Sequence, residues 1–88
     1  MNNKNLVKIL KAIGNERRLS ILQNLFKTKE LSVGQISELI ELSFKSTSNH
    51  LSVLSGVDLI ESRQVSLNRF YSIKRASFPK KFITFFKN

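Results

Sequence analysis

The sequence predicts a mainly helical fold that carries one small β-hairpin. Before residue 58, apolar residues recur every three or four positions, which is the spacing of one buried helical face. From residue 59 the pattern changes to short runs typical of strands, and it returns to helical spacing near the C-terminus. With 88 residues, the chain has room for one small core. We therefore expect a single domain over residues 1–88, built of four helices, two strands and a last helix.

The stretch from Leu31 to Leu54 contains two short helices in close succession. Ser32 and Gln35 have the spacing of a capping box, in which a hydroxyl and an amide each bond a free backbone group at a helix start. Apolar residues on one face then predict a helix from about Val33 to Ile40; they are Ile36, Leu39 and Ile40. Ser43 is a second N-cap candidate shortly after this helix.

The helix expected at about residues 44–56 has two unlike faces. The residues expected to face the core are Phe44, Thr47, Leu51 and Leu54. The opposite face is small and polar, and its members are Lys45, Ser46, Ser48, Asn49 and Ser52. Such a face is by default only a solvated one, but Ser and Asn are poor interior helix formers, so their use here favours a function. Two helices joined by a tight turn, the second with a hydrogen-bonding exposed face, form the helix-turn-helix layout that reads a DNA major groove.

Residues 59–73 are expected to form an antiparallel hairpin with its tip at residues 65–67. A hairpin directly after a helix-turn-helix is a wing, so the complete layout is a winged helix-turn-helix. Arg63 and Arg69 lie on different strands, and we expect both to reach a phosphate backbone or a minor groove. The tip lacks an Asn-Gly or Asp-Gly pair, so the turn itself does not fix the register.

The first two helices are expected to support this unit. An apolar stripe predicts a helix over residues 3–14; its members are Leu6, Ile9, Leu10 and Ile13. Gly14 is expected to end it in the left-handed conformation, and Asn15 to cap the next helix. The buried face of that next helix is Leu19, Leu22, Leu25 and Phe26. Arg17 and Arg18 at its start are expected to be solvated or ion-paired, with phosphate contact as the alternative.

The C-terminal segment 78–87 is expected to be a helix with an aromatic face. Ser77 is a candidate cap, Pro79 suits the first helical position, and the aromatic face is Phe82, Phe85 and Phe86. Left in water, these rings would form a sizeable apolar patch. We expect them to pack on the first helix of the same chain or of a second subunit, so that the segments 3–14 and 78–87 hold a symmetric homodimer. A basic amphipathic segment on an anionic membrane is the alternative.

The charge balance points to a polyanionic partner. The net charge is +9 and the isoelectric point about 10.4. All six acids lie between Glu16 and Glu61, and the chain after Ser62 has only basic charged residues. Composition alone does not separate nucleic acid from an anionic membrane surface.

Several classes of protein fit the sequence poorly. Without cysteine the chain has no disulfide, thiolate metal site or thiol redox sensor. One histidine, His50, and scattered carboxylates give no catalytic constellation, so we expect no enzyme, metal site or cofactor. For His50 we expect boundary packing or one phosphate or base contact. No signal peptide or membrane-spanning run is apparent, so a cytoplasmic location is expected.

Four stretches in order resemble the winged-helix repressors of the ArsR/SmtB family. They are LKAIGNERRLSIL, ELSVGQISELI, LSFKSTSNHLSVL, and DLIESR with RFYSI, and the resemblance covers about Leu6 to Lys74. It implies a homodimeric transcriptional repressor on a palindromic operator, with Lys45, Ser46, Ser48, Asn49 and His50 on the base-reading helix and the hairpin from Arg63 to Arg69 as the wing.

The chain also departs from that family. Where metal-sensing members carry paired cysteines, this chain has Ser32 and Gly34, and its last helix lacks the acids and histidines of the other common metal site. Asp58 replaces a usual glycine, the wing tip has no glycine, and Phe44 replaces a usually polar residue. No metal signal is therefore expected, and the effector stays open.

The leading hypothesis is a sequence-specific double-stranded DNA-binding repressor that occludes a promoter. The expected DNA contacts are Lys45, Ser46, Ser48, Asn49, His50, Ser52, Arg63 and Arg69. The expected dimer contacts are Leu6, Ile9, Leu10, Ile13, Phe82, Phe85 and Phe86. The alternative is a winged-helix module for protein interaction or membrane binding that uses the basic aromatic C-terminal tail.

Overall fold

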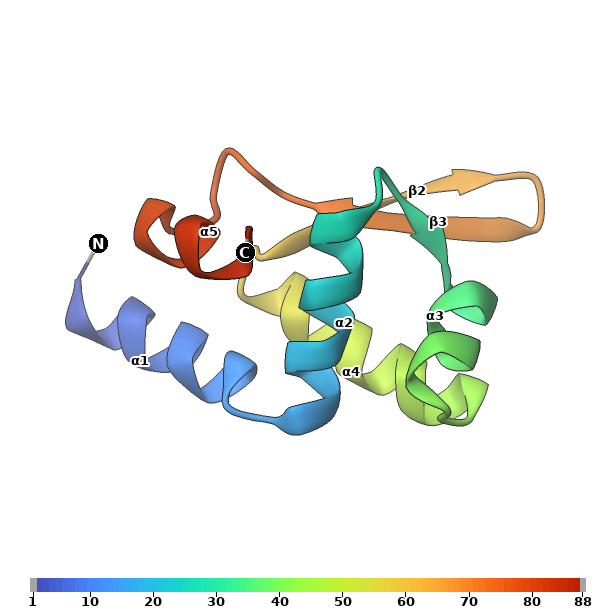
Figure 1. Cartoon of the computed structure of the whole chain (residues 1–88), viewed down its shortest axis with the longest axis horizontal. Coiled ribbons are helices and arrows are strands. Elements are labelled where there is room, and N and C mark those ends of the chain that lie inside the picture. The colour runs from blue at the N-terminus through green and yellow to red at the C-terminus, as the bar shows by residue number, and fades with distance from the viewer. Residues whose placement is uncertain (1, 88) are drawn as a thin grey trace.

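The computed structural model describes residues 2–87 and shows five helices and three strands (Figure 1). The elements are α1 (Asn3–Ile13), α2 (Glu16–Lys27), β1 (Leu31–Ser32), α3 (Val33–Ile40), α4 (Phe44–Gly56), β2 (Ile60–Val65), β3 (Asn68–Ile73) and α5 (Lys80–Phe86). This confirms the predicted winged helix-turn-helix fold class and the element order, apart from one added strand. Met1 and Asn88, the end residues of the expected domain 1–88, lie outside the described residues.

The added strand is β1, which was expected to be loop and helix cap. Leu31 pairs with Tyr71 and Ser32 with Phe70, so the antiparallel sheet has the order β1-β3-β2. Two residues are too few to show a strand period, so only the neighbouring β3 reveals this pairing. Strand β1 joins the wing to the start of α3, and the distal part of the hairpin projects beyond it (Figure 1).

One apolar core joins all the helices to the base of the sheet. Its fully buried centre comes from the middle of the chain: Ile21, Leu22, Leu25, Ile36, Leu51, Leu54 and Leu59 are each 0% exposed. In Figure 1, α2 stands at the centre of the molecule, with α1 and α5 at one end and α3 and the hairpin tip at the other. The residues of this buried centre come from segments far apart in the sequence, and their mutual burial fixes α4 against α2 and α3.

The junction between α1 and α2 differs from the expectation for Gly14. Gly14 ends α1 but has φ −71° and ψ 50°, so the left-handed prediction is wrong. Asn15 N donates to Ile13 O at 2.6 Å, which makes this a three-residue turn of the inverse γ type. A Cβ at Gly14 would lie 3.0 Å from Leu10 O, so close backbone approach explains the glycine. As predicted, Asn15 caps α2: its Oδ1 accepts from Arg18 N at 3.1 Å.

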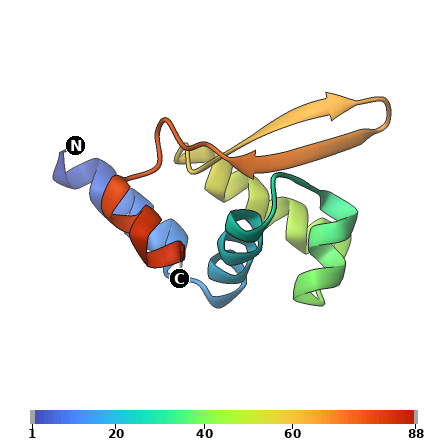
Figure 2. The ribbon, with the colours of Figure 1, turned by 45° about the horizontal axis from the view of Figure 1, so that its top comes forward.

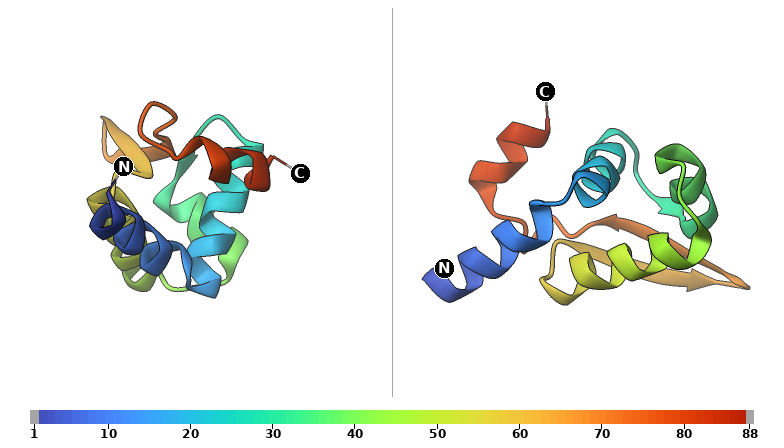
Figure 3. Two further views of the ribbon diagram at one scale, coloured as in Figure 1. Left: turned by 90° about the vertical axis from the view of Figure 1, so that its left-hand side faces the viewer. Right: turned by 90° about the horizontal axis from the view of Figure 1, so that it is seen from below.

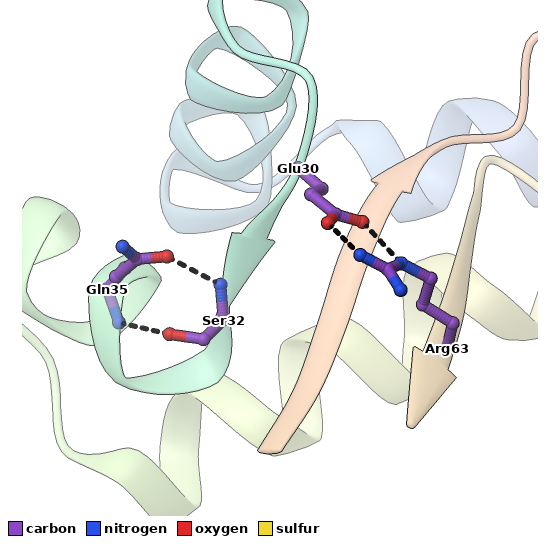
Figure 4. A network of polar contacts seen from close by, with 4 residues as sticks. All are labelled: Glu30, Ser32, Gln35 and Arg63. Carbon is purple, nitrogen blue, oxygen red and sulfur yellow. Dashed lines mark hydrogen bonds and ion pairs between the residues drawn. The ribbon is translucent and has the colours of Figure 1, made fainter. Parts of the chain in front are cut away.

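Backbone and side-chain caps define the helix-turn-helix. The predicted capping box is present: Ser32 N donates to Gln35 Oε1 at 2.9 Å, and Gln35 N donates to Ser32 Oγ at 3.2 Å (Figure 4). At the end of α3, Glu41 has φ 52°, and Leu42 N donates to Ser37 O at 3.1 Å. This left-handed residue ends α3 and sets the turn that leads into α4. Ser43 then caps α4, as expected.

The C-terminal end of α4 follows the sequence closely. Asp58 has φ 60°, as expected for the residue that stops the helix. Asp58 N donates to Ser55 O and Leu59 N donates to Leu54 O, both at 3.1 Å. These are the two backbone hydrogen bonds that define a Schellman motif. The buried contact that accompanies such a motif is present, since Leu54 and Leu59 are both fully buried.

Two residues expected to be on buried helix faces are exposed. Phe44 is 63% exposed and Leu39 is 53% exposed, so these assignments were wrong. Both lie beside the turn between α3 and α4: Phe44 precedes the first buried residue of α4, and Leu39 lies one residue before the buried Ile40. Helical spacing gives the direction of a side chain but not how far the core extends along the helix. By contrast, Thr47, Leu51 and Leu54 are buried as predicted.

The C-terminal helix is shorter than expected and is partly tied to the core. It begins at Lys80 after Pro79, and no side chain caps it, so the role expected for Ser77 was wrong. Phe86 stacks on Phe26 with ring centroids 5.1 Å apart, and Phe78 meets both rings edge-on. The aromatic residues of this segment therefore divide between the core and the surface.

One buried hydroxyl suggests a stabilising substitution. Thr47 is 0% exposed, and its Oγ1 has no hydrogen-bond partner within residues 2–87. Thr47→Val keeps the branched shape and removes the unpaired polar atom, so it should raise the free energy of unfolding by about 1 kcal/mol. Urea unfolding followed by circular dichroism measures this. Thr84→Val, at an exposed position of α5, is the control and should change stability by less than about 0.5 kcal/mol. A loss of stability in Thr47→Val would contradict the assignment.

Candidate nucleic-acid interface

The outward face of α4 is polar, accessible and uncommitted. Lys45, Asn49 and Ser52 are exposed, and Ser46 and Ser48 are partly exposed. Within residues 2–87 none of these five side chains makes a hydrogen bond or an ion pair in the structure. Their donors and acceptors are therefore free to bond an external surface. The burial of Thr47, Leu51 and Leu54 on the other side holds this face outward.

The start of α4 and the wing tip lie at the same end of the molecule. Figures 1 and 3 both place the N-terminal turn of α4 next to α3, and the hairpin projects beyond them. The helices α1 and α5 lie at the opposite end. The molecule is 37 Å long in its longest direction, so the two ends can serve different partners.

Two arginines of α2 bond to the two helices of the helix-turn-helix on their inner side. Arg17 Nη1 donates to the carbonyl oxygen of Ile40 and, at 3.4 Å, to that of Glu41. These acceptors are free carbonyls at the C-terminal end of α3, where a cation is favourable. Arg17 was expected to be solvated or ion-paired, so this contact with the end of α3 was not predicted. An arginine at the start of one helix and a carbonyl at the end of another share no sequence spacing that would reveal the contact.

His50 is held by the second of these arginines. Arg18 Nε donates to His50 Nδ1 at 3.1 Å, and Arg18 Nη1 donates to Ala12 O at 3.4 Å. His50 is therefore neutral in this arrangement, with Nδ1 as acceptor. Desolvation by burial lowers the pKa of His50, and the charges of Arg18 and Arg17 lower it further. His50 thus packs at the boundary, one of the roles expected for it.

The base of the wing is fixed by an ion pair. Arg63 Nε and Nη2 donate to the two carboxylate oxygens of Glu30 at 2.9 and 2.5 Å (Figure 4). The hydrogen bond from Arg63 lowers the pKa of Glu30. Glu30 directly precedes β1, so the pair joins β2 to the segment that enters α3. The Arg63 side chain stays 62% exposed, so one arginine can position the wing and still present its outer edge to solvent.

The pairing register places the two wing arginines on opposite faces. Arg63 pairs with Phe70 and Arg69 with Gln64, and neighbouring positions along a strand point to opposite sides. Arg69 Nη1 donates to Ser62 Oγ at 2.9 Å. The tip is the two-residue loop of Ser66, with φ 57°, and Leu67. Regular pairing therefore continues up to the loop although no glycine is present.

The opposite end of the molecule carries an apolar surface. In Figure 2, α5 lies in front of α1 and runs in much the same direction. Leu10, Ile13, Phe82, Phe85 and Phe86 line a hollow of about 260 Å³ between them. A second hollow of about 480 Å³ adjoins it and is lined by Leu6, Leu10, Pro79, Lys80, Lys81 and Phe82.

Exposure differs among the residues expected in a dimer interface. Leu10 is 50% and Phe85 is 63% exposed, and Leu6, Ile13 and Phe82 are partly exposed. Ile9 and Phe86 lie in the core of their own chain at 6% and 8%, which leaves them little area for a partner. The available apolar surface therefore runs from Leu10 to Phe85.

The described residues hold neither a cluster of metal ligands nor a membrane-spanning helix. Among residues 2–87, no three His, Asp or Glu side chains gather closely enough to hold a metal ion. No helix in this range is long and apolar enough to cross a bilayer.

The comparisons with known proteins agree with this geometry. The model of the family described as "Bacterial regulatory protein, arsR family" matches residues 15–62, which run from the cap of α2 through the helix-turn-helix to β2. That match spans more than half of the chain. The chain belongs to the arsR family. This confirms the resemblance found in the sequence. The family and the relatives named below are transcription regulators and not enzymes, as expected from the sequence.

Two arsR relatives differ in the direction of regulation that their names state. The transcriptional activator HlyU of Vibrio cholerae is 42% identical over 72 residues, covering 82% of this chain and 66% of HlyU. The transcriptional repressor PagR of Bacillus anthracis is 37% identical over 65 residues, covering 74% of this chain and 65% of PagR. The matches thus span slightly less than two thirds of the length of these relatives.

Solved structures of similar proteins share the whole fold. Reduced HlyU from Vibrio cholerae superposes with a TM-score of 0.82 at 35% identity, covering 98% of this chain and 85% of that one. A homodimeric winged helix-turn-helix DNA-binding domain from Mycobacterium bovis, a possible ArsR-family regulator, gives a TM-score of 0.80 at 25% identity, covering 94% of this chain and 72% of that one. Both place an arsR fold over nearly all of the described residues.

The environment of His50 predicts a loss of stability in mild acid. Since the pKa of His50 in the folded chain lies below its ordinary value of 6.5, the unfolded chain binds the proton more readily. This contribution to stability is complete above pH 6.5 and is lost as the pH falls from 6.5 toward the folded pKa. The urea midpoint of the wild type should therefore be lower at about pH 5.5 than at about pH 7.5, and His50→Asn should reduce that difference. An equal difference in both proteins would contradict the role of His50.

Proposed function

We propose that this arsR-family chain is a transcription regulator that binds double-stranded DNA as a homodimer and represses by occluding a promoter. The observation that carries the proposal is the outward face of α4, whose side chains are accessible and have no partners within residues 2–87. The net charge of +9 supports a polyanionic partner and favours fast, salt-dependent association.

In the proposed complex, α4 lies in the major groove. N-terminal residues of such a recognition helix reach base edges, while the preceding helix crosses the backbone. Asn49 is the amide suited to bond an adenine edge, Lys45 suits a guanine or a phosphate, and the nearby serines bond either kind of group. Ser46, Ser48 and Ser52 are these serines. His50, already bonded to Arg18, offers at most its Nε2 hydrogen to the DNA.

The wing supplies contacts to the backbone or the minor groove. Arg63 and Arg69 approach from the two faces of the hairpin, so a wing that enters a groove edge-on can use both. Arg63 keeps its outer edge exposed while bonded to Glu30, and Arg69 is exposed. Contacts of this kind set register and affinity rather than sequence preference.

A homodimer would bury the apolar surface between α1 and α5. Leu10 and Phe85 are large, exposed and adjacent to one hollow, and that surface lies away from the N-terminal turn of α4. A two-fold axis there would turn two copies of α4 in the same direction and so match a palindromic site, with half-sites about one helical turn apart. The homodimeric Mycobacterium bovis domain of similar fold supports this assembly.

Repression needs only occupancy of a promoter, which one small domain provides. The names of the two relatives include both an activator and a repressor, so the position of the site relative to the promoter decides the outcome. The membrane alternative has less support, because α5 has only seven residues and Phe86 is turned into the core. Flotation with anionic liposomes, expected to be negative, separates the two functions.

Selection of bound fragments from random duplex DNA at stated salt tests the proposal directly. We expect a palindromic site with two half-sites, and we expect affinity for it to fall steeply as salt rises. A promoter carrying the site should give less transcript when the protein is added. Failure to enrich any sequence at low salt would reject the function, and a rise in transcript would reject repression alone.

Asn49→Ala should relax base preference at one position of each half-site. A good side-chain pair with a base is worth about 1–3 kcal/mol of discrimination, so preference at that position should fall about tenfold while phosphate contacts keep general affinity. Fragment selection and binding titrations measure both quantities. Asn3→Ala, at an exposed asparagine of α1, is the matched control and should leave the preference intact. An unchanged preference in Asn49→Ala would remove this residue from base reading.

Leu10→Ser should convert the dimer to a monomer and weaken binding to the palindrome. The substitution places a polar group at the centre of the proposed interface, where half of the leucine is exposed in one chain. Sedimentation velocity reports the mass. Leu39→Ser, at a leucine of similar exposure on α3, is the control and should remain dimeric. A wild type that sediments as a monomer, or a Leu10→Ser variant that stays dimeric, would contradict this interface.

A further inference from the structure

Phe44 is an unusual residue for its surroundings. It is the first residue of α4 and 63% exposed, whereas the buried face of that helix begins only at Thr47. Lys45 and Ser46 follow it, and both belong to the polar outer part of the helix. A phenyl ring left in water loses the free energy that burial would give it. The ring therefore has apolar area available in the midst of a polar, basic surface.

The position of the ring is set by helix geometry. Phe44 and Ser48 are four residues apart, so they are neighbours on one side of α4, and Lys45 and Asn49 are neighbours beside them. Phe44 thus lies in the first turn of α4, at the border between its buried side and the proposed base-reading face. This end of α4 is also the end toward which the wing projects (Figures 1 and 3).

We propose that Phe44 is a specificity-determining residue that packs against the C5-methyl group of one thymine in each half-site. This inference rests on the proposed function of DNA binding. A phenyl ring has no hydrogen bond to offer, and the thymine methyl is the apolar group that base pairs present in the major groove. The first turn of a recognition helix is the part that reaches base edges. The ring therefore reads a methyl group where Asn49 reads a hydrogen-bonding edge.

The surroundings favour DNA over a protein partner for this ring. A protein-binding patch would need several adjoining apolar side chains, but the next residues along the outer face are a lysine, serines and an asparagine. Lys45, which follows the ring on the exposed side of the helix, attracts phosphates to this face. Leu39, the other exposed apolar residue beside the turn, lies on α3 rather than on α4.

Deoxyuridine, which is thymidine without its C5-methyl group, tests the inference on the wild-type protein. In the site selected by the wild type, each thymine is replaced in turn and the binding constant is measured at fixed salt. Replacement in one half-site should weaken binding about fourfold, and replacement in both half-sites about fifteenfold, which is the effect of losing one and two buried methyl groups. In Phe44→Ala the same replacements should have no effect, and Phe44→Leu should keep part of it.

The controls separate failure of this inference from failure of DNA binding. Leu39→Ala should show the same dependence on the methyl group as the wild type. If the wild type enriches no site, the proposed function fails, and the inference fails with it. If the wild type enriches a site but tolerates deoxyuridine at every thymine, DNA binding stands and the inference is overturned. Equal losses in the wild type and in Phe44→Ala would likewise overturn it, because the methyl group would then contact another residue.

Discussion

The burial of one side of α4 is the constraint on which the rest of the structure depends. Thr47, Leu51 and Leu54 pack against α2 and α3 with no exposed surface, so the rotation of the helix about its own axis is fixed. Arg18 adds a polar contact from behind, through His50. Since one side is committed to the core, the side with Asn49 must face outward. A binding surface on a rigid helix costs little ordering when a partner binds.

Packing and free polar groups divide the molecule into two working ends. At one end, polar side chains that are unbonded within residues 2–87 lie on α4, and Arg63 and Arg69 lie on the wing. At the other, Leu10 and Phe85 keep apolar area exposed between α1 and α5. The pair of Glu30 and Arg63 belongs to the first end, where it ties the wing to the strand that enters α3. An exposed ion pair of this kind contributes little stability, so its role is to orient the hairpin.

Local chemistry made much of the fold predictable, and long-range contacts account for what was missed. The capping box at Ser32 and the left-handed Asp58 follow from nearest neighbours along the chain, so the bounds of α3 and α4 were correctly predicted. The two-residue strand β1 and the carbonyl contacts of Arg17 join segments far apart in sequence, and no spacing encodes them. Phe44 was wrongly assigned to the core, because helical spacing does not show where along the helix the core ends.

The most direct test of the account is a map of backbone amide shifts in the ¹⁵N-labelled protein as its selected duplex is added. The account predicts that the largest changes cluster on residues 44–52 and on the wing around residues 63–69, while α1 and α5 keep the shifts of the free dimer. Changes concentrated on α1 and α5, with the outer face of α4 unaffected, would contradict it.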